Sequence, residues 1–169
     1  IFFGEIDIPY IPGLTYRFTY SNHMINTKNY SFTPSFNAGG LNRVASASNA
    51  VTESQDMNVE SLVKYNRDFN ADHSLDVTFL YNYNFANNTT LTANSNTFPT
   101  DLLEFYGLSL GENQTTDAGY SDYRAIAMMG RVNYKFKNRY LLTLTGRRDG
   151  ASVFSANNKF AFFPSMALG

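Results

Sequence analysis

Cysteine and tryptophan are both absent from this 169-residue chain. The lack of cysteine excludes a disulfide framework and any zinc site built on thiolate ligands. Charge is sparse and balanced, since 13 Lys and Arg stand against 14 Asp and Glu for a net charge of −1. No basic block is present, so the composition gives no reason to expect nucleic acid or an anionic surface as a partner.

Long apolar runs are also missing. No stretch approaches the ~18–20 apolar residues of a membrane helix. The start shows no charged region followed by an apolar one, so no signal peptide is visible. The chain opens with IFFGEIDI and closes with SMALG, and both look like strands. We therefore expect a segment of a longer polypeptide.

Aromatic and small polar residues are abundant, with 15 Phe and 12 Tyr among many Asn, Thr and Ser. This mixture favours strands and hydrated loops. Apolar and polar residues alternate clearly over 14–21, and the pattern returns over 75–85, 126–136 and 140–147. Because side chains of a strand alternate between its two faces, each strand should have one apolar and one polar face.

The alternation predicts an all-β, antiparallel fold with seven strands. Their expected ranges are 2–9, 14–30, 54–69, 74–92, 122–137, 139–149 and 159–168. The connections are short at 10–13, 70–73 and 137–139, long at 31–53 and 93–121, and intermediate at 150–158. Outer-membrane barrels alternate short periplasmic turns with larger extracellular loops in this way. We therefore predict a transmembrane β-barrel segment whose short turns are periplasmic and whose long loops are extracellular.

Aromatic residues gather beside the short turns: Tyr10, Tyr16, Tyr65, Phe69, Tyr134, Phe136 and Tyr140. Aromatic rings with a polar tip prefer the headgroup level of a membrane. The alternative is that these rings form the core of a soluble barrel. The asymmetry of the connections favours the membrane barrel.

The stretch RRDG, residues 147–150, follows one of the alternating strands. If Leu142 and Leu144 face lipid, Arg147 faces the interior, because Arg on the lipid face costs ~2–4 kcal/mol near the midplane. Arg148 and Asp149 are expected near the extracellular rim. Gly150 is expected to permit the turn into a polar tip at 155–158.

Several motifs resemble the barrel of the SusC-type TonB-dependent transporters of Bacteroidetes. The matching stretches are PGLTYR (12–17), NTFPTDLL (96–103), GRVNY (130–134), RYLL (139–142), RRDG (147–150), the pair Asn157-Asn158, FPS (163–165) and Gly169. Ala151 and Val153 depart mildly from the family pattern and do not challenge the fold.

The resemblance implies a larger, plugged barrel of about 22 strands. Residues 1–169 would form part of one barrel domain, with the plug, TonB box and signal peptide outside this chain. It further implies active import of oligosaccharides or peptides across the outer membrane. The implied partners are a SusD-like surface lipoprotein, the TonB–ExbB–ExbD complex, outer-membrane lipid and a glycan or peptide substrate. The alternatives are a passive outer-membrane porin or adhesin barrel, and a soluble ligand-binding barrel.

Residues with catalytic chemistry form no convincing constellation, so neither an enzyme nor a cofactor is expected. His23 and His73 are isolated and suit a hydrated loop or rim. No Ser lies in a G-x-S-x-G elbow. Glu112, Asp117 and Asp122 lack the spacing of an EF-hand, which makes calcium a weak hypothesis.

Two groups of residues are the candidates for function. The first should line the lumen: Arg17, Asn58, Glu60, Lys64, Arg131, Asn133 and Lys135. Contact with the plug or with neighbouring strands is the simpler role for most of them. The second lies in the long loop 93–121 and comprises Phe98, Leu102, Leu103 and Tyr106. A short helix capped by Thr100 or Asp101 should present them to neighbouring loops or to the lipoprotein.

Overall fold

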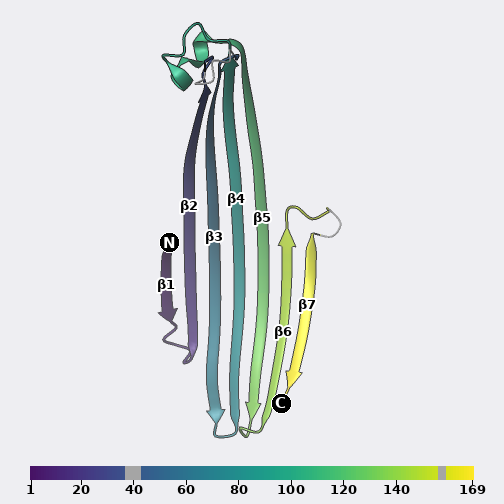
Figure 1. Ribbon diagram of the computed structural model, residues 1–169. Helices are drawn as coiled ribbons and strands as arrows, with labels where there is room; N and C mark the ends of the chain where they lie inside the picture. Colours follow the sequence, from purple (N-terminus) through teal and green to yellow (C-terminus); the bar gives the residue numbers. More distant parts are fainter. Residues whose placement is uncertain (37–42, 156–158) are drawn as a thin grey trace. The chain divides into compact units, whose positions relative to one another are not determined.

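The computed structural model describes residues 1–36, 43–155 and 159–169. The glycines Gly39 and Gly40 and the asparagines Asn157 and Asn158 lie outside the described residues. The elements are β1 (Phe2–Asp7), β2 (Leu14–Thr33), β3 (Ser46–Asn70), β4 (His73–Asn96), η1 (Glu104–Leu110), β5 (Glu112–Phe136), β6 (Tyr140–Ala151) and β7 (Phe160–Leu168). The seven strands form one sheet in chain order, with consecutive strands as hydrogen-bonded neighbours (Figure 1).

The seven predicted strands are confirmed, but several bounds were wrong. Strands β1, β6 and β7 end within two residues of the predicted limits. In contrast, β3 begins at Ser46 rather than 54 and β5 at Glu112 rather than 122, while β2 and β4 run on to Thr33 and Asn96. The predicted loops 31–53 and 93–121 therefore shrink to connections at 34–45 and 97–111.

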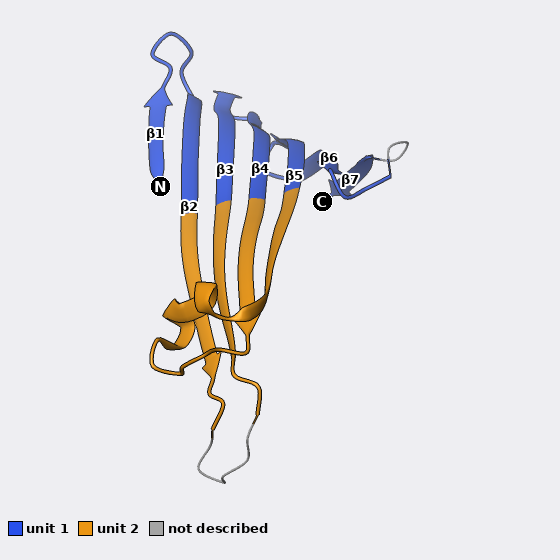
Figure 2. Cartoon of the chain, turned by 90° about the horizontal axis from the view of Figure 1, so that it is seen from above, with its two compact units in different colours: residues 1–23, 56–86, 123–169 blue, residues 24–55, 87–122 orange. Residues whose placement is uncertain are grey.

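The chain divides into two compact units that share strands (Figure 2). Unit 1 comprises residues 1–23, 56–86 and 123–169, and holds the three short turns together with β1, β6 and β7. Unit 2 comprises residues 24–55 and 87–122, and holds the two longer connections and η1.

The pairing of strands in unit 1 arranges its side chains in rows. On one face of β5, β6 and β7 the rows are Phe136–Tyr140, Tyr134–Leu142–Leu168, Val132–Leu144–Met166, Gly130–Gly146–Pro164, Met128–Arg148–Phe162 and Ile126–Gly150–Phe160. All but one of these seventeen residues are apolar, aromatic or glycine. The rows on the other face hold polar residues such as Thr143, Asn133 and Arg131 together with some apolar ones such as Met129 and Phe163, so β5–β7 have one apolar face and one predominantly polar face.

The apolar face of unit 1 is largely uncovered. Phe79, Phe162 and Met166 keep 47%, 65% and 68% of their surface exposed. Among the described residues, the buried hydrophobic side chains are only Ala45 and Ala47. A contiguous apolar surface of this kind marks contact with a membrane or a partner. None of the described helices is both long and apolar enough to span a membrane.

The strands of unit 2 are polar on both sides. Residues 87–96 of β4 read NNTTLTANSN, and residues 112–122 of β5 read ENQTTDAGYSD. Thr52 hydroxyl contacts the Thr90 hydroxyl at 3.4 Å, and the Ser54 hydroxyl donates to Asn88 at 2.7 Å. Cross-strand polar pairs hold these strands together in place of apolar packing.

Two local predictions were wrong. The helix η1 begins at Glu104, not at Thr100 or Asp101, and its N-cap residue Leu103 makes no side-chain capping bond. Gly150 does not lie in a turn but inside β6, where it pairs with Phe160. A Cβ at Gly150 would stand 2.4 Å from a Phe160 ring carbon, so glycine is required for the ring to lie across the strand.

Candidate functional site

The polar face of unit 1 carries a network of hydrogen bonds across four strands. Asn133 Nδ2 donates to Asp76 Oδ1 at 3.0 Å, and the Thr143 hydroxyl donates to Asn133 Oδ1 at 2.9 Å. Asn66 Nδ2 reaches the other Asp76 oxygen at 3.5 Å. These bonds link β3, β4, β5 and β6. Asn133 is satisfied by structural partners, which favours a role in the wall over direct ligand contact.

The other predicted lumen residues share this polar face but do not form one site. Asn58 exchanges side-chain bonds with Asn82 at 3.1 and 3.5 Å, and Arg131 Nε donates to Thr145 at 3.3 Å. Arg17 lies over the Phe3 ring, 5.2 Å from its centroid. Glu60 and Lys64 fall on the face of Asn58 by strand alternation, with Glu60 half-buried and Lys64 exposed. Because these residues are spread over several strands, they are better described as lining a wall than as forming a single binding site.

Lys135 lies apart from the rest of this group, beside the short turns. It lines a hollow of about 340 Å³ together with Asp68, Asp72 and Asn138. The Lys137 backbone N–H donates to the Asp72 carbonyl at 2.7 Å, which joins the two neighbouring turns. Lys135 is thus placed among acidic residues of the turns, and a contact with ligand in mid-wall is not supported.

A belt of rings surrounds the short turns on the apolar face, and it includes a histidine whose role the sequence did not indicate. His73 Nδ1 lies 2.5 Å from the Tyr134 hydroxyl, and its ring packs 4.9 Å from that of Phe136. Phe136 stacks with Tyr140 at 6.3 Å. Lys137 and Arg139 each lie over one of these two rings. Rings with polar tips and nearby cations are typical of a membrane interface.

The RRDG stretch sends its two arginines to opposite faces. Arg147 Nε binds both carboxylate oxygens of Asp149 at 2.8 and 2.9 Å on the polar face. Arg148 pairs with Met128 and Phe162 on the apolar face, and its guanidinium lies 4.4 Å from the Phe160 ring centroid. Arg147 therefore lies on the polar face, as alternation predicted, while Arg148 lies among apolar neighbours.

The connection 97–111 in unit 2 is fixed by contacts that differ from those expected. Asp101 Oδ2 accepts from the Ser35 backbone N–H at 3.0 Å and from its hydroxyl at 2.7 Å. Phe105 stacks on Tyr30 at 5.1 Å, and Phe98 meets Phe32 edge-on at 6.0 Å. The link from 35 to 101 left no signal in the sequence, because the two residues are distant along the chain.

The predicted apolar side of this loop points outward. Leu102 and Tyr106 remain 89% and 81% exposed, and Leu103 is 48% exposed, whereas Phe98 is half-buried against Phe32. The sequence predicted that Leu102, Leu103 and Tyr106 contact neighbouring loops or the lipoprotein. Within this chain Phe98 and Phe105 make the packing contacts of the loop, and the contact of the other three residues stays a prediction. The three exposed residues are left as an open apolar surface.

In residues 1–36, 43–155 and 159–169, no three His, Asp or Glu side chains come together as metal ligands, so Glu112, Asp117 and Asp122 do not form a site. The described residues provide a polar face and an apolar face in unit 1, and a 97–111 connection that is fixed by contacts with β2 and the residues that follow it.

The two-faced sheet and its rows define a segment of a transmembrane β-barrel. The chain is 33% identical over 174 residues to TonB-dependent receptor P26 and 31% identical over 160 residues to TonB-dependent receptor P3, both of Formosa agariphila. These matches cover 98% and 94% of the chain. Over 44 residues it is 52% identical to TonB-dependent receptor SusC of Bacteroides thetaiotaomicron. No family model matches.

A solved structure of the RagAB peptide transporter matches 97% of the chain with a TM-score of 0.86 at 21% identity. Over nearly its whole length the chain is therefore similar to TonB-dependent receptors, and its fold is that of a segment of their β-barrel. It spans only 16–17% of the length of the two Formosa relatives and 18% of the RagAB chain.

Proposed function

We propose that this segment forms part of the wall of an outer-membrane importer that takes up oligosaccharides or peptides. The observation that carries the proposal is the sheet of unit 1, with apolar rows on one face and a hydrogen-bonded polar network on the other. A barrel wall needs lipid contact outside and a polar lumen inside. Relatives named TonB-dependent receptors support active import.

The rest of the transporter lies outside this chain in the proposal. Seven strands leave two open edges, and a bilayer requires every backbone group to be paired, so the remaining strands must close the barrel. Residues 1–169 belong to one barrel domain, and the plug and TonB box are supplied by another part of the polypeptide. Energy comes from TonB–ExbB–ExbD acting on that plug, and no chemical step is involved.

A lumen lined by several strands accepts a hydrated chain molecule better than a small ion. The polar face provides hydrogen-bond donors and acceptors and both positive and negative charge, through Asn58, Glu60, Lys64 and Arg131. Such a surface suits either sugar hydroxyls or a peptide backbone. Among the proteins that this chain resembles, one is named SusC and one is a peptide transporter, and the proposal keeps both substrate classes.

The orientation follows from the connections. The short turns, including 71–72, face the periplasm, and the connections 34–45 and 97–111 face the medium. The test places single cysteines at Ser109 and Ala71, both exposed, since the chain contributes no cysteine of its own. An impermeant thiol reagent on intact cells should label Ser109→Cys and spare Ala71→Cys. The reverse pattern would overturn the orientation.

The exposed apolar residues of the 97–111 connection form the proposed contact with a SusD-like surface lipoprotein. Leu102, Leu103 and Tyr106 stay exposed, although the Tyr106 ring lies 4.6 Å from that of Phe105, and a partner would cover them. Replacing all three with Ser in the full-length protein should leave insertion intact while co-purification of the lipoprotein and uptake both fall. Tyr120→Ser, an exposed change in β5, is the control.

Three results of this experiment have distinct meanings. Loss of lipoprotein and of uptake supports the docking role. Loss of uptake with full lipoprotein retention points instead to substrate contact by the loop. Unchanged retention and uptake would show that the exposed residues are incidental.

A further inference from the structure

In the rows of β5–β7 on the apolar face, Arg148 is the one charged side chain. It lies between Met128 and Phe162 in the fifth row counted from the Phe136–Tyr140 row beside the short turns. The row before it, Gly130–Gly146–Pro164, has almost no side-chain bulk and borders a shallow hollow of about 640 Å³. The cation therefore stands beside an apolar depression on the face that our proposed function directs to lipid.

The height of Arg148 can be estimated from the rows. Successive rows lie about 6.7 Å apart along a strand. With a tilt of about 40°, the Arg148 Cα stands about 20 Å above the first row, inside an apolar band about 25 Å tall. Arg124 lies two residues beyond Ile126 along β5. By the same calculation it stands about 31 Å above the first row and therefore lies outside the apolar band.

The Arg148 side chain extends towards the nearer edge of this band. Its guanidinium lies over Phe160, which belongs to the next row in the direction of Arg124. Arg124 itself lies over Phe85, 5.5 Å from the ring centroid. Long cationic side chains keep their stems in the apolar region and place the charge at the headgroup level in this manner.

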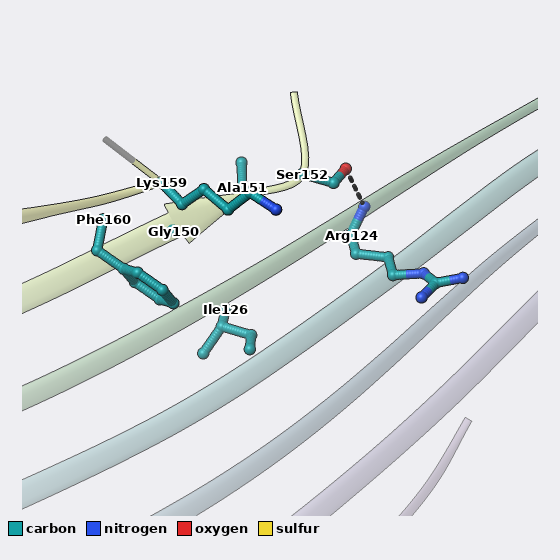
Figure 3. Close-up of a pocket in the computed structure, with 7 residues that line it drawn as sticks. All are labelled: Arg124, Ile126, Gly150, Ala151, Ser152, Lys159 and Phe160. Atoms are coloured by element: carbon teal, nitrogen blue, oxygen red, sulfur yellow. Dashed lines mark hydrogen bonds between the residues drawn. The ribbon is translucent and has the colours of Figure 1, made fainter. Parts of the chain in front are cut away.

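A small pocket lies at that level. It measures about 150 Å³ and is lined by Arg124, Ile126, Gly150, Ala151, Ser152, Lys159 and Phe160 (Figure 3). At the pocket, the Arg124 backbone N–H of β5 donates a hydrogen bond of 3.0 Å to the hydroxyl of Ser152, which follows β6. Figure 3 shows the Lys159 side chain extending towards Ser152, while Ile126 and the Phe160 ring form the apolar part. Gly150 is covered by that ring and cannot carry a side chain there.

Charge complementarity selects the occupant. In β5–β7, neither the row of Arg148 nor the rows on either side of it contain a carboxylate. Asp149 lies on the opposite face, bound to Arg147. A guanidinium at the headgroup level beside an apolar hollow fits a ligand that combines a phosphate with acyl chains.

We propose that the outer wall of this segment binds a phosphorylated membrane lipid. Arg148 holds the phosphate at the headgroup level, and the acyl chains lie along the Gly130–Gly146–Pro164 row. The proposal depends on the lipid-facing orientation in our proposed function, but it does not depend on substrate or on TonB.

The test uses the full-length protein in phosphatidylcholine nanodiscs that contain dioleoyl phosphatidic acid. Native mass spectrometry measures how much phosphatidic acid remains bound relative to phosphatidylcholine. Arg148→Gln should lower the relative affinity for phosphatidic acid about tenfold, the size of one charge-assisted contact. Arg148→Lys should retain part of it. Arg131→Gln, on the polar face of the neighbouring strand, is the matched control and should change nothing.

Each outcome is decisive. Equal retention in Arg148→Gln and wild type, or an equal loss in Arg131→Gln, overturns the proposal, and so does displacement of the lipid by inorganic phosphate. If Arg148→Gln fails to assemble, the wild-type protein decides the question, because equal retention of phosphatidic acid and phosphatidylcholine by the wild type would also overturn the proposal. Uptake measured on the same variants separates lipid binding from the proposed import function. A protein that selects phosphatidic acid but takes up no substrate would contradict the import function and leave lipid binding intact.

Discussion

Units 1 and 2 share strands β2–β5, yet they are stabilised in different ways. In unit 1 one face of β5–β7 is apolar except for Arg148, the other carries most of the polar residues, and large apolar side chains such as Phe79 stay exposed. In unit 2 the same strands carry Asn, Thr and Ser on both faces, and the polar pairs Thr52–Thr90 and Ser54–Asn88 join them. The comparison shows that the strand hydrogen-bond ladder continues where the apolar pattern stops.

Strand length supports the same distinction. A strand needs only about 9–11 residues to cross a bilayer. Strands β3 and β5 have 25 residues each, so more than half of each is available for another environment. If unit 1 lies in the apolar layer of the membrane and unit 2 in water, as the proposed function requires, equivalent variants in the two units should respond differently.

The largest expected difference lies within the single strand β4. Phe79→Arg in unit 1 should impair barrel assembly and lower the free energy of unfolding by ~2–4 kcal/mol, since a midplane site must bury a charge in lipid. Leu91→Arg in unit 2 replaces a residue of similar exposure and should change it by less than ~0.5 kcal/mol. Urea titration of both full-length variants in lipid vesicles measures the two values.

Thr78→Arg is the control for the face of the strand. It lies next to Phe79 but points to the polar side by alternation, so assembly should be affected less. Equal losses at Phe79 and Leu91 would break the assignment of the two units. A greater loss at Thr78 than at Phe79 would place the register one residue off.

The sequence predicted unit 1 far better than unit 2, and the reason is physical. Alternation reports contact with two unlike environments, so it identified β6 and β7 closely and placed Arg147 on the polar face. Where both faces of a strand meet water, the pattern vanishes although the backbone pairing persists. The starts of β3 at Ser46 and β5 at Glu112 were missed for this reason.

Candidate residues followed the same rule. The polar side of Asn133 was predictable from alternation, but its bonds to Asp76 and Thr143 depend on how neighbouring strands align, which one strand alone does not encode. Gly150 was assigned to a turn because glycine commonly occupies turns. Its real constraint is the Phe160 ring on the next strand.

The second prediction compares one glycine from each unit. Gly150→Ala in unit 1 forces the added methyl against the Phe160 ring and should cost ~1–3 kcal/mol, as overpacking does. Gly119→Ala in β5 of unit 2 meets no atom within 4 Å and should be neutral, or stabilising by ~0.4–1 kcal/mol. Urea midpoints of the two variants provide the measurement. A double variant Gly150→Ala with Phe160→Leu should recover part of the loss if the ring is the cause.

The third prediction concerns the order of unit 2. Asp101→Ala removes both bonds to Ser35 and should release the 97–111 connection locally, at a cost of ~1–2 kcal/mol. Amide hydrogen exchange at Ser35 should rise, while the global urea midpoint stays unchanged. Asp117→Ala, at an exposed position of β5, is the control. A fall in the global midpoint would show that the loop is part of the cooperative unit of the barrel.

The smallest effect is expected where the two units should not differ. The Asn58–Asn82 pair lies on the polar face of unit 1, and the Thr52–Thr90 pair lies in unit 2. If the polar face of unit 1 meets a water-filled lumen, truncating either pair exchanges one protein bond for water. Asn82→Ala and Thr90→Ala should then each cost ~0.2–1 kcal/mol. Both values come from the same urea titrations, with a double-mutant cycle on each pair.

A loss well above this range at Asn82 alone would mean that the site is dry, packed against another part of the transporter such as the plug. In that case the difference between the units would extend to both faces of the sheet, and Asn58 would be a structural contact rather than part of a hydrated path for substrate.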